Sequence, residues 1–149
     1  MKKFMVDTNI INRILDHNLD LKIFKGSDKA FFATHVQRDE IVKTPDATRR
    51  KELLSIFKEI ADSVPTESAL WGKSKWGKCK WGEDDLVEKI RIELDKKKKR
   101  KNNSEDALIA DTAIKNKFIL ITEDGPLHYV VMEIFKGSAQ KLDEFLNSP

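Results

Sequence analysis

The 149-residue sequence has little cysteine, little histidine and no long apolar runs. Its one cysteine, Cys79, excludes a framework of internal disulfides and is typical of the reducing cytoplasm, where we expect this protein to be located. The histidines, His17, His35 and His128, are too scattered for the ligand spacing of a zinc site. No apolar run approaches the roughly 18 residues that span a membrane. Asp7 also interrupts the first apolar run before a signal peptide can form, so we expect no membrane partner.

Apolar residues make up 40% of the chain and charged residues 36%, which suffices for a buried core beneath a highly charged surface and argues against disorder. The length fits one domain, so we expect residues 1–149 to form a single unit. The net charge of +3 is unevenly distributed. Residues 71–101 contain twelve Lys and Arg against six Asp and Glu, whereas the remainder has sixteen basic and nineteen acidic residues. A basic segment of +6 thus interrupts a chain that is otherwise −3.

Short apolar runs alternate with helical patterns along the sequence. We expect strands at residues 3–6, 30–33, 118–121 and 139–142. Cap residues and apolar stripes predict helices after residues 7, 34 and 46, from about residue 84, over 105–116 and over about 125–135. Strands separated by helices indicate an α/β fold with a central, mostly parallel sheet and helices on both faces. In such sheets the functional crevice lies at the carboxyl ends of the strands.

Two of the predicted strands are followed by an aspartate at their carboxyl ends. Asp7 follows the strand at 3–6, and Asp124 follows the strand at 118–121. Glu40 lies beside the apolar stripe of its helix, and Asp106 lies in the first turn of its helix, on a face of small residues. We therefore expect these four carboxylates to converge at one edge of the sheet.

Converged carboxylates repel one another, which raises their pKa values unless a cation neutralises them. A cluster with oxygen ligands and neither His nor Cys favours a hard ion, Mg²⁺ or Mn²⁺. Such an ion activates water and orients a phosphate, so the implied reaction is phosphodiester hydrolysis. Each acid also has an ordinary interpretation: Asp7 as a helix cap, Asp106 as a partner of the helix dipole, Glu40 as a solvated side chain and Asp124 as a turn residue.

In their order along the chain, four parts of the sequence resemble the motifs of the PIN-domain family: Val6-Asp7-Thr8-Asn9, Glu40 on a helix, Asp106-Ala107-Leu108-Ile109-Ala110 and Ile121-Thr122-Glu123-Asp124. The resemblance implies a three-layer α/β/α fold and a divalent-metal-dependent endoribonuclease that acts on single-stranded RNA. It also implies that the four acids are the catalytic and metal-binding residues, supported by Asn9 and Thr122. Many small PIN proteins are VapC-type toxins, which implies an antitoxin protein as a partner. A homodimer is a further assembly that the sequence leaves open.

Asp111 departs from that family pattern, because it is an acid where a small residue is common. It lies five residues after Asp106, and that spacing rotates it by about 140° around a helix. We therefore expect Asp111 at the periphery or on the surface. The region 66–101 is also longer and more basic than its counterpart in the compact toxins.

The basic segment contains Trp-Gly pairs every five residues, at Trp71, Trp76 and Trp81, a period that fits neither helix nor strand. Single-stranded nucleic acid requires cations for its phosphates and aromatic faces for its bases. On that ground we expect nucleic-acid binding by Lys73, Lys75, Trp76, Lys78 and Lys80. The alternative is that the tryptophans pack on the core and anchor a long loop. We interpret Lys96–Lys101 as a solvated charge run, or else as an arm that steers phosphates or directs nuclear import.

The leading hypothesis is a Mg²⁺- or Mn²⁺-dependent endoribonuclease, as the toxin of a toxin–antitoxin pair. One alternative is a nucleic-acid-binding or regulatory module whose metal site is unused, and another is a structure-specific DNA nuclease with the same fold. A phosphatase of the haloacid-dehalogenase type is disfavoured. It would need a second aspartate two residues after Asp7, where this sequence has Asn9.

Overall fold

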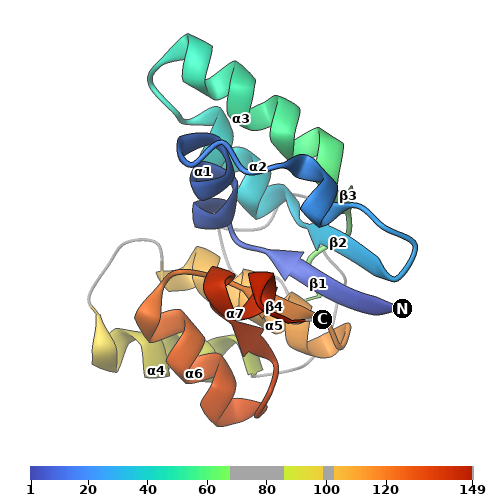
Figure 1. Ribbon diagram of the computed structural model, residues 1–149. Coiled ribbons are helices and arrows are strands. Elements are labelled where there is room, and N and C mark those ends of the chain that lie inside the picture. Colours follow the sequence, from blue (N-terminus) through green and yellow to red (C-terminus); the bar gives the residue numbers. More distant parts are fainter. Residues whose placement is uncertain (68–85, 99–102, 149) are drawn as a thin grey trace.

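The computed structural model describes residues 1–67, 86–98 and 103–148 (Figure 1). Its centre is a five-stranded sheet in the order β3-β2-β1-β4-β5, in which every pair of neighbouring strands is parallel. The strands are β1 (Lys2–Val6), β2 (Lys29–Ala33), β3 (Asp62–Ser63), β4 (Ile119–Ile121) and β5 (Ala139–Gln140). In the central register Phe4 of β1 lies between Phe31 of β2 and Ile119 of β4. The predicted α/β fold class is confirmed, and the sheet is parallel throughout.

Helices and one 3-10 helix link and follow these strands. They are α1 (Thr8–Asp16), η1 (Leu21–Phe24), α2 (His35–Val42), α3 (Ala47–Ile60), α4 (Leu86–Lys97), α5 (Asn103–Lys115), α6 (Gly125–Ile134) and α7 (Leu142–Leu146). Among the helices of the described ranges, none is both long and apolar enough to cross a membrane.

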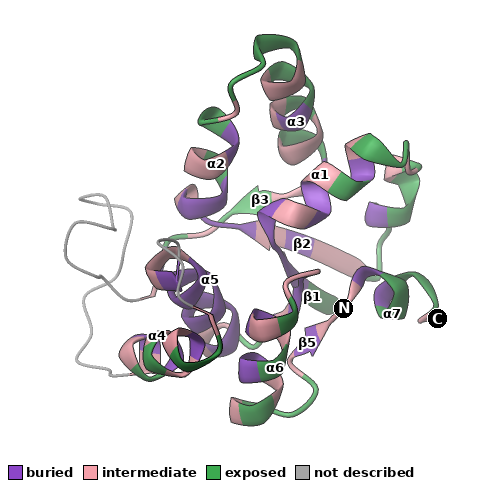
Figure 2. Ribbon diagram, turned by 90° about the vertical axis from the view of Figure 1, so that its left-hand side faces the viewer, coloured by how far each residue is buried: buried purple, intermediate pink, exposed green. Residues whose placement is uncertain are grey.

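Two apolar clusters cover the two faces of the sheet, because successive side chains of a strand point to opposite sides. Met5 and Leu120 pack with α4, α5 and α6 on one face. Phe4, Val6 and Ile121 pack with α1, α3 and α7 on the other. Figure 2 shows that α5 is buried along most of its length, whereas α3 exposes much of its surface. The result is the three-layer α/β/α arrangement that the sequence predicts.

Three helices, α1, α2 and α3, begin at cap residues that the sequence predicts, and α6 begins at Asp124, which the sequence suggested only as a turn residue or a site acid. The side chains of Asp7, Thr34, Asp46 and Asp124 accept hydrogen bonds from backbone N–H groups at the starts of α1, α2, α3 and α6. The first turn of a helix leaves N–H groups without helical partners, so such acceptors fix where the helix starts. Pro126 lies in the first turn of α6, where its missing N–H costs nothing.

Two expectations from the sequence are wrong in detail. The strand expected at 139–142 ends at Gln140, because Leu142 already begins α7. The Glu144 carboxylate accepts a hydrogen bond from the Lys141 N–H at 3.1 Å and so fixes the start of that helix. Asp111 is not at the surface but fully buried, and its carboxylate pairs with Lys115 Nζ at 3.0 Å. A rotation away from Asp106 brings no exposure, because most residues of α5 are covered by the sheet and its neighbouring helices.

Candidate active site

Asp7 lies at the carboxyl end of β1, where its backbone N–H donates to the Ile121 carbonyl of β4 at 3.1 Å. Its carboxylate accepts hydrogen bonds from the Thr8 N–H at 2.8 Å, the Thr122 hydroxyl at 2.7 Å and the Asn9 amide at 3.2 Å. The side chain is buried, which raises the pKa of Asp7, and these hydrogen bonds only partly offset the effect. The nearby Asp124 raises the pKa further.

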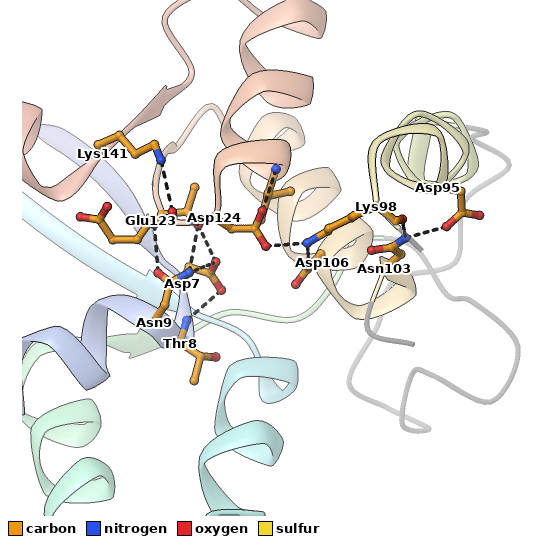
Figure 3. A network of polar contacts seen from close by, with 12 residues as sticks. Asp7, Thr8, Asn9, Asp95, Lys98, Asn103, Asp106, Glu123, Asp124 and Lys141 are labelled. Carbon is orange, nitrogen blue, oxygen red and sulfur yellow. Dashed lines mark hydrogen bonds and ion pairs between the residues drawn. The ribbon is translucent and has the colours of Figure 1, made fainter. Parts of the chain in front are cut away.

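Hydrogen bonds of Asn9 and Thr122 link the starts of α1 and α6, and Figure 3 shows Asn9 close to Asp7 and Glu123. Asn9 donates to the Thr122 hydroxyl at 3.3 Å and accepts from the Glu123 N–H at 3.1 Å. The Thr122 hydroxyl accepts in turn from the Asp124 N–H at 3.1 Å. The two polar residues expected beside the acids therefore lie beside them and fix the backbone that carries Asp7 and Asp124.

Asp106 and Asp124 are joined by a lysine (Figure 3). Lys98 Nζ lies 2.8 Å from Asp106 Oδ2 and 2.5 Å from Asp124 Oδ2. The pKa of Asp106 is raised to about 7 by burial and by repulsion from Asp7, although Lys98 acts against both. Burial lowers the pKa of Lys98, but its bonds to the two aspartates outweigh that effect, and its pKa lies above the ordinary value. The lysine is therefore a charged ammonium.

Glu40 belongs to α2 and lies near enough to Asp7 and Asp106 to be repelled by both. Burial raises the pKa of Glu40 to about 7, with further contributions from repulsion by Asp7 and Asp106. Its Oε1 is buried without a hydrogen-bond partner, and the Thr8 side chain acts against the rise in the pKa of Glu40 without cancelling it. Asp7 and Asp124 follow adjacent strands, and Glu40 and Asp106 lie near enough for the acids to repel one another at this end of the sheet.

The site contains residues that the sequence interpretation missed. Gln37 is fully buried and links α2 to the strand ahead of Asp7, because its amide donates to the Val6 carbonyl at 3.1 Å. The spacing of Thr34 and Gln37 is that of a capping box, which is readable from sequence. Lys98 was hidden within a run of lysines. The interpretation of that run as solvated is wrong for Lys98, whose side chain is only 7% exposed.

The donor chemistry of this group fits a hard divalent cation. The donors it offers are carboxylate oxygens, of which Glu40 Oε1 is buried without a hydrogen-bond partner, and burial with mutual repulsion raises the pKa of Asp7, Glu40 and Asp106. Within the described parts of the chain, no three acidic, histidine or cysteine side chains are placed closely enough to hold one ion together. Lys98 Nζ instead lies between the carboxylates of Asp106 and Asp124.

The basic tryptophan segment lies mostly outside the described residues. This applies to all five residues expected to bind nucleic acid, Lys73, Lys75, Trp76, Lys78 and Lys80, so their role stays a prediction. Of the later lysine run, the structure describes Lys96, Lys97 and Lys98. Lys96 pairs with Glu93 at the surface, and Lys97 Nζ lies 3.9 Å from the centre of the Tyr129 ring.

No protein-family model and no curated protein matches the chain. Solved structures of similar fold include a chain of VapBC2 from Rickettsia felis bound to a DNA fragment from its promoter, with a TM-score of 0.58 and 18% identity over 93% of this chain and 98% of that one. A chain of VapBC-1 from nontypeable Haemophilus influenzae has a TM-score of 0.55 and 15% identity, over 93% of this chain and 97% of that one. A third structure is VapBC-5 from Mycobacterium tuberculosis, a member of the VapBC family of toxin–antitoxin systems. One of its chains has a TM-score of 0.50 and 18% identity, over 95% of this chain and 98% of that one. Identities this low define a common fold and no more.

Proposed function

We infer the function of this chain from its acids and its fold, which is the VapC-like PIN fold that the sequence predicts and the solved VapBC structures confirm. We propose a nuclease that hydrolyses phosphodiester bonds, specifically an endoribonuclease that acts on single-stranded RNA with Mg²⁺ or Mn²⁺. The proposed metal-binding and catalytic residues are Asp7, Glu40, Asp106 and Asp124.

The observation that supports this proposal best is the coupling of four acids from four separate segments. Asp7 and Asp124 follow adjacent parallel strands, and Glu40 and Asp106 reach them from α2 and α5. Burial and mutual repulsion raise the pKa of Asp7, Glu40 and Asp106, so bringing these acids together costs folding free energy, which favours a functional role over a structural one. A bound Mg²⁺ or Mn²⁺ would supply Lewis acidity toward a phosphate and would activate water.

The chain's own residues would then orient the ligands. Hydrogen bonds from Thr8, Asn9 and Thr122 fix the Asp7 carboxylate, and the Leu127 N–H fixes Asp124 Oδ1 at 3.1 Å. In the proposed hydrolysis the oxygen of water forms a bond to phosphorus while the P–O3′ bond breaks. The 3′ oxygen takes up a proton, which leaves a 5′-phosphate and a 3′-hydroxyl.

An antitoxin protein is the partner that we propose, because the solved structures of similar fold are VapBC toxin–antitoxin complexes. Coexpression with the product of a small neighbouring gene would test this: the pair should copurify, and the partner should suppress cleavage. A homodimer remains a second proposed assembly, which light scattering of the purified protein would reveal.

The nuclease proposal is tested on a fluorescent single-stranded RNA with Mg²⁺ or Mn²⁺. Wild type should cleave the RNA, and EDTA should stop this cleavage. The cleavage rate of Asp7→Asn and of Asp124→Asn should be at least about 100-fold lower. Asparagine is a good helix cap, so both variants should fold. Asp143→Asn, at an exposed position of α7, makes the same chemical change as a control and should remain active.

The results separate the remaining alternatives. Equal cleavage by wild type and both site variants would exclude the assigned acids. Preference for single-stranded DNA or for a branched duplex would favour a DNA nuclease of the same fold. RNA binding in a gel shift without cleavage under any divalent ion would favour a binding module, and that binding should weaken with salt.

A further inference from the structure

The ammonium of Lys98 lies where two of the proposed metal ligands meet. It contacts Asp106 Oδ2 and Asp124 Oδ2, and all three side chains are buried or nearly so, at 7%, 6% and 13% exposure. A cation in contact with two carboxylates neutralises part of their charge. Lys98 therefore neutralises the same carboxylate oxygens that a divalent ion would neutralise.

Lys98 is held there by its backbone as well as by its side chain. Its N–H donates to the Leu94 carbonyl at 2.8 Å, which continues α4 by one residue. Its carbonyl accepts from the Asn103 amide at 2.8 Å, and that amide also donates to Asp95 at 2.7 Å (Figure 3). Asn103 is itself buried and begins α5, the helix that carries Asp106. The lysine thus belongs to the architecture of the site and is not an exposed side chain that reaches it by chance.

Two cations cannot occupy the same carboxylate oxygens at the same distance without strong repulsion. A metal ion that uses Asp106 Oδ2 and Asp124 Oδ2 must therefore displace the Lys98 ammonium. We propose that Lys98 is an internal counter-cation that competes with the divalent metal for Asp106 and Asp124 and so sets the metal affinity of the site. This inference rests on the proposed metal-dependent function.

Titration with Mn²⁺ at pH 8, measured by isothermal calorimetry, tests the competition without relying on cleavage. Lys98→Met should bind Mn²⁺ at least about tenfold more tightly than wild type. Tenfold corresponds to ~1.4 kcal/mol, less than one charge-assisted hydrogen bond contributes. Because Lys98→Met leaves two carboxylates unpaired, Lys98→Gln provides a second variant that retains a donor but no charge. Mn²⁺ should also raise the melting temperature of both variants more than that of wild type.

Two further variants identify where the ion binds and which lysine matters. Lys96→Met removes a charge two residues away, from a lysine that pairs with Glu93 at the surface, and should leave Mn²⁺ affinity within about twofold of wild type. Asp106→Asn removes a proposed ligand and should abolish the tight binding.

Unchanged or weaker Mn²⁺ binding in both Lys98 variants, with binding still lost in Asp106→Asn, would overturn the competition while leaving the metal site intact. Mn²⁺ binding that is absent from wild type and both Lys98 variants, or insensitive to Asp106→Asn, would overturn the proposed metal site itself. Binding that appears only when Lys98 is replaced would support the competition in its strongest form.

Discussion

Replacing Glu40 with glutamine isolates the energetic effect of gathering acids at this edge of the sheet. Glu40 is the acid whose Oε1 is buried without a hydrogen-bond partner, and burial and repulsion raise its pKa to about 7. Glutamine has nearly the same shape but cannot ionise. We therefore expect Glu40→Gln to be more stable than wild type at pH 8 in EDTA, although most substitutions lower stability.

The magnitude follows from the difference in proton binding between the folded and unfolded states. A rise in the pKa of Glu40 from its ordinary value of 4.5 to about 7 corresponds to about 3 kcal/mol. Between those two pH values the folded protein holds a proton that the unfolded chain has lost, so the free energy of unfolding falls as pH rises. Above about pH 7 both states are ionised and the loss is complete. Glu40→Gln should thus gain about 2–3 kcal/mol at pH 8, and this gain should vanish near pH 4.

The difference in the free energy of unfolding between the two proteins is measured by urea unfolding at intervals from pH 4 to 8 in EDTA. Circular dichroism monitors the unfolding. Titrating groups that do not interact with Glu40 cancel between the two proteins. Asp7 and Asp106 repel Glu40, so the raised pKa of each should fall somewhat when Glu40 loses its charge. Glu52→Gln, on the exposed side of α3, is the matched control and should run parallel to wild type. Parallel curves for wild type and Glu40→Gln across the whole range would refute the coupled cluster.

Two further predictions concern Gln37 and the lysines of the basic segment. Gln37→Leu should lower the free energy of unfolding by about 2–4 kcal/mol in urea, because it strips buried partners from the Val6 carbonyl and the Thr34 N–H. In gel shifts in EDTA, replacing four lysines of the basic segment by glutamine should weaken binding of single-stranded RNA. The slope of log affinity against log salt should fall by roughly 0.7 per lost phosphate contact, and an unchanged slope would exclude such contacts by Lys73, Lys75, Lys78 and Lys80.

The sequence predicts most of the fold because its local signals agree with one another. Apolar runs mark β1, β2 and β4, and a capping side chain precedes α1, α2, α3 and α6. Where local signals are weak, the prediction is poorer. β3 consists of two exposed residues, Asp62 and Ser63, whose strand character comes from pairing with Phe32 and Ala33. No property of those two residues alone indicates a strand.

The sequence predicts where the acids lie, but it does not predict the burial of Lys98. Asp7 and Asp124 follow strands, so the parallel topology alone brings them to the same edge. Lys98 stands in a run of like residues, and its burial depends on where α4 ends and α5 begins. Asp111 shows the same limit, because its burial depends on how completely neighbouring elements surround α5. Position along one element is local information, whereas enclosure by several elements is not.

The apolar core, more than the polar network, is what holds the acids together. Asp106 and Asp7 repel, yet α5, which carries Asp106, and α1, which Asp7 caps, are anchored on opposite faces of the sheet: Leu108 and Ile109 of α5 in one cluster, Ile10 of α1 in the other. Because each helix is fixed by its own buried side chains, its acid cannot withdraw without exposing apolar surface. Repulsion is therefore relieved locally, by protonation or by a cation, and Lys98 provides such a cation within the chain. The lysine run that looked separate from the acids in sequence thus contributes one member to their charge balance.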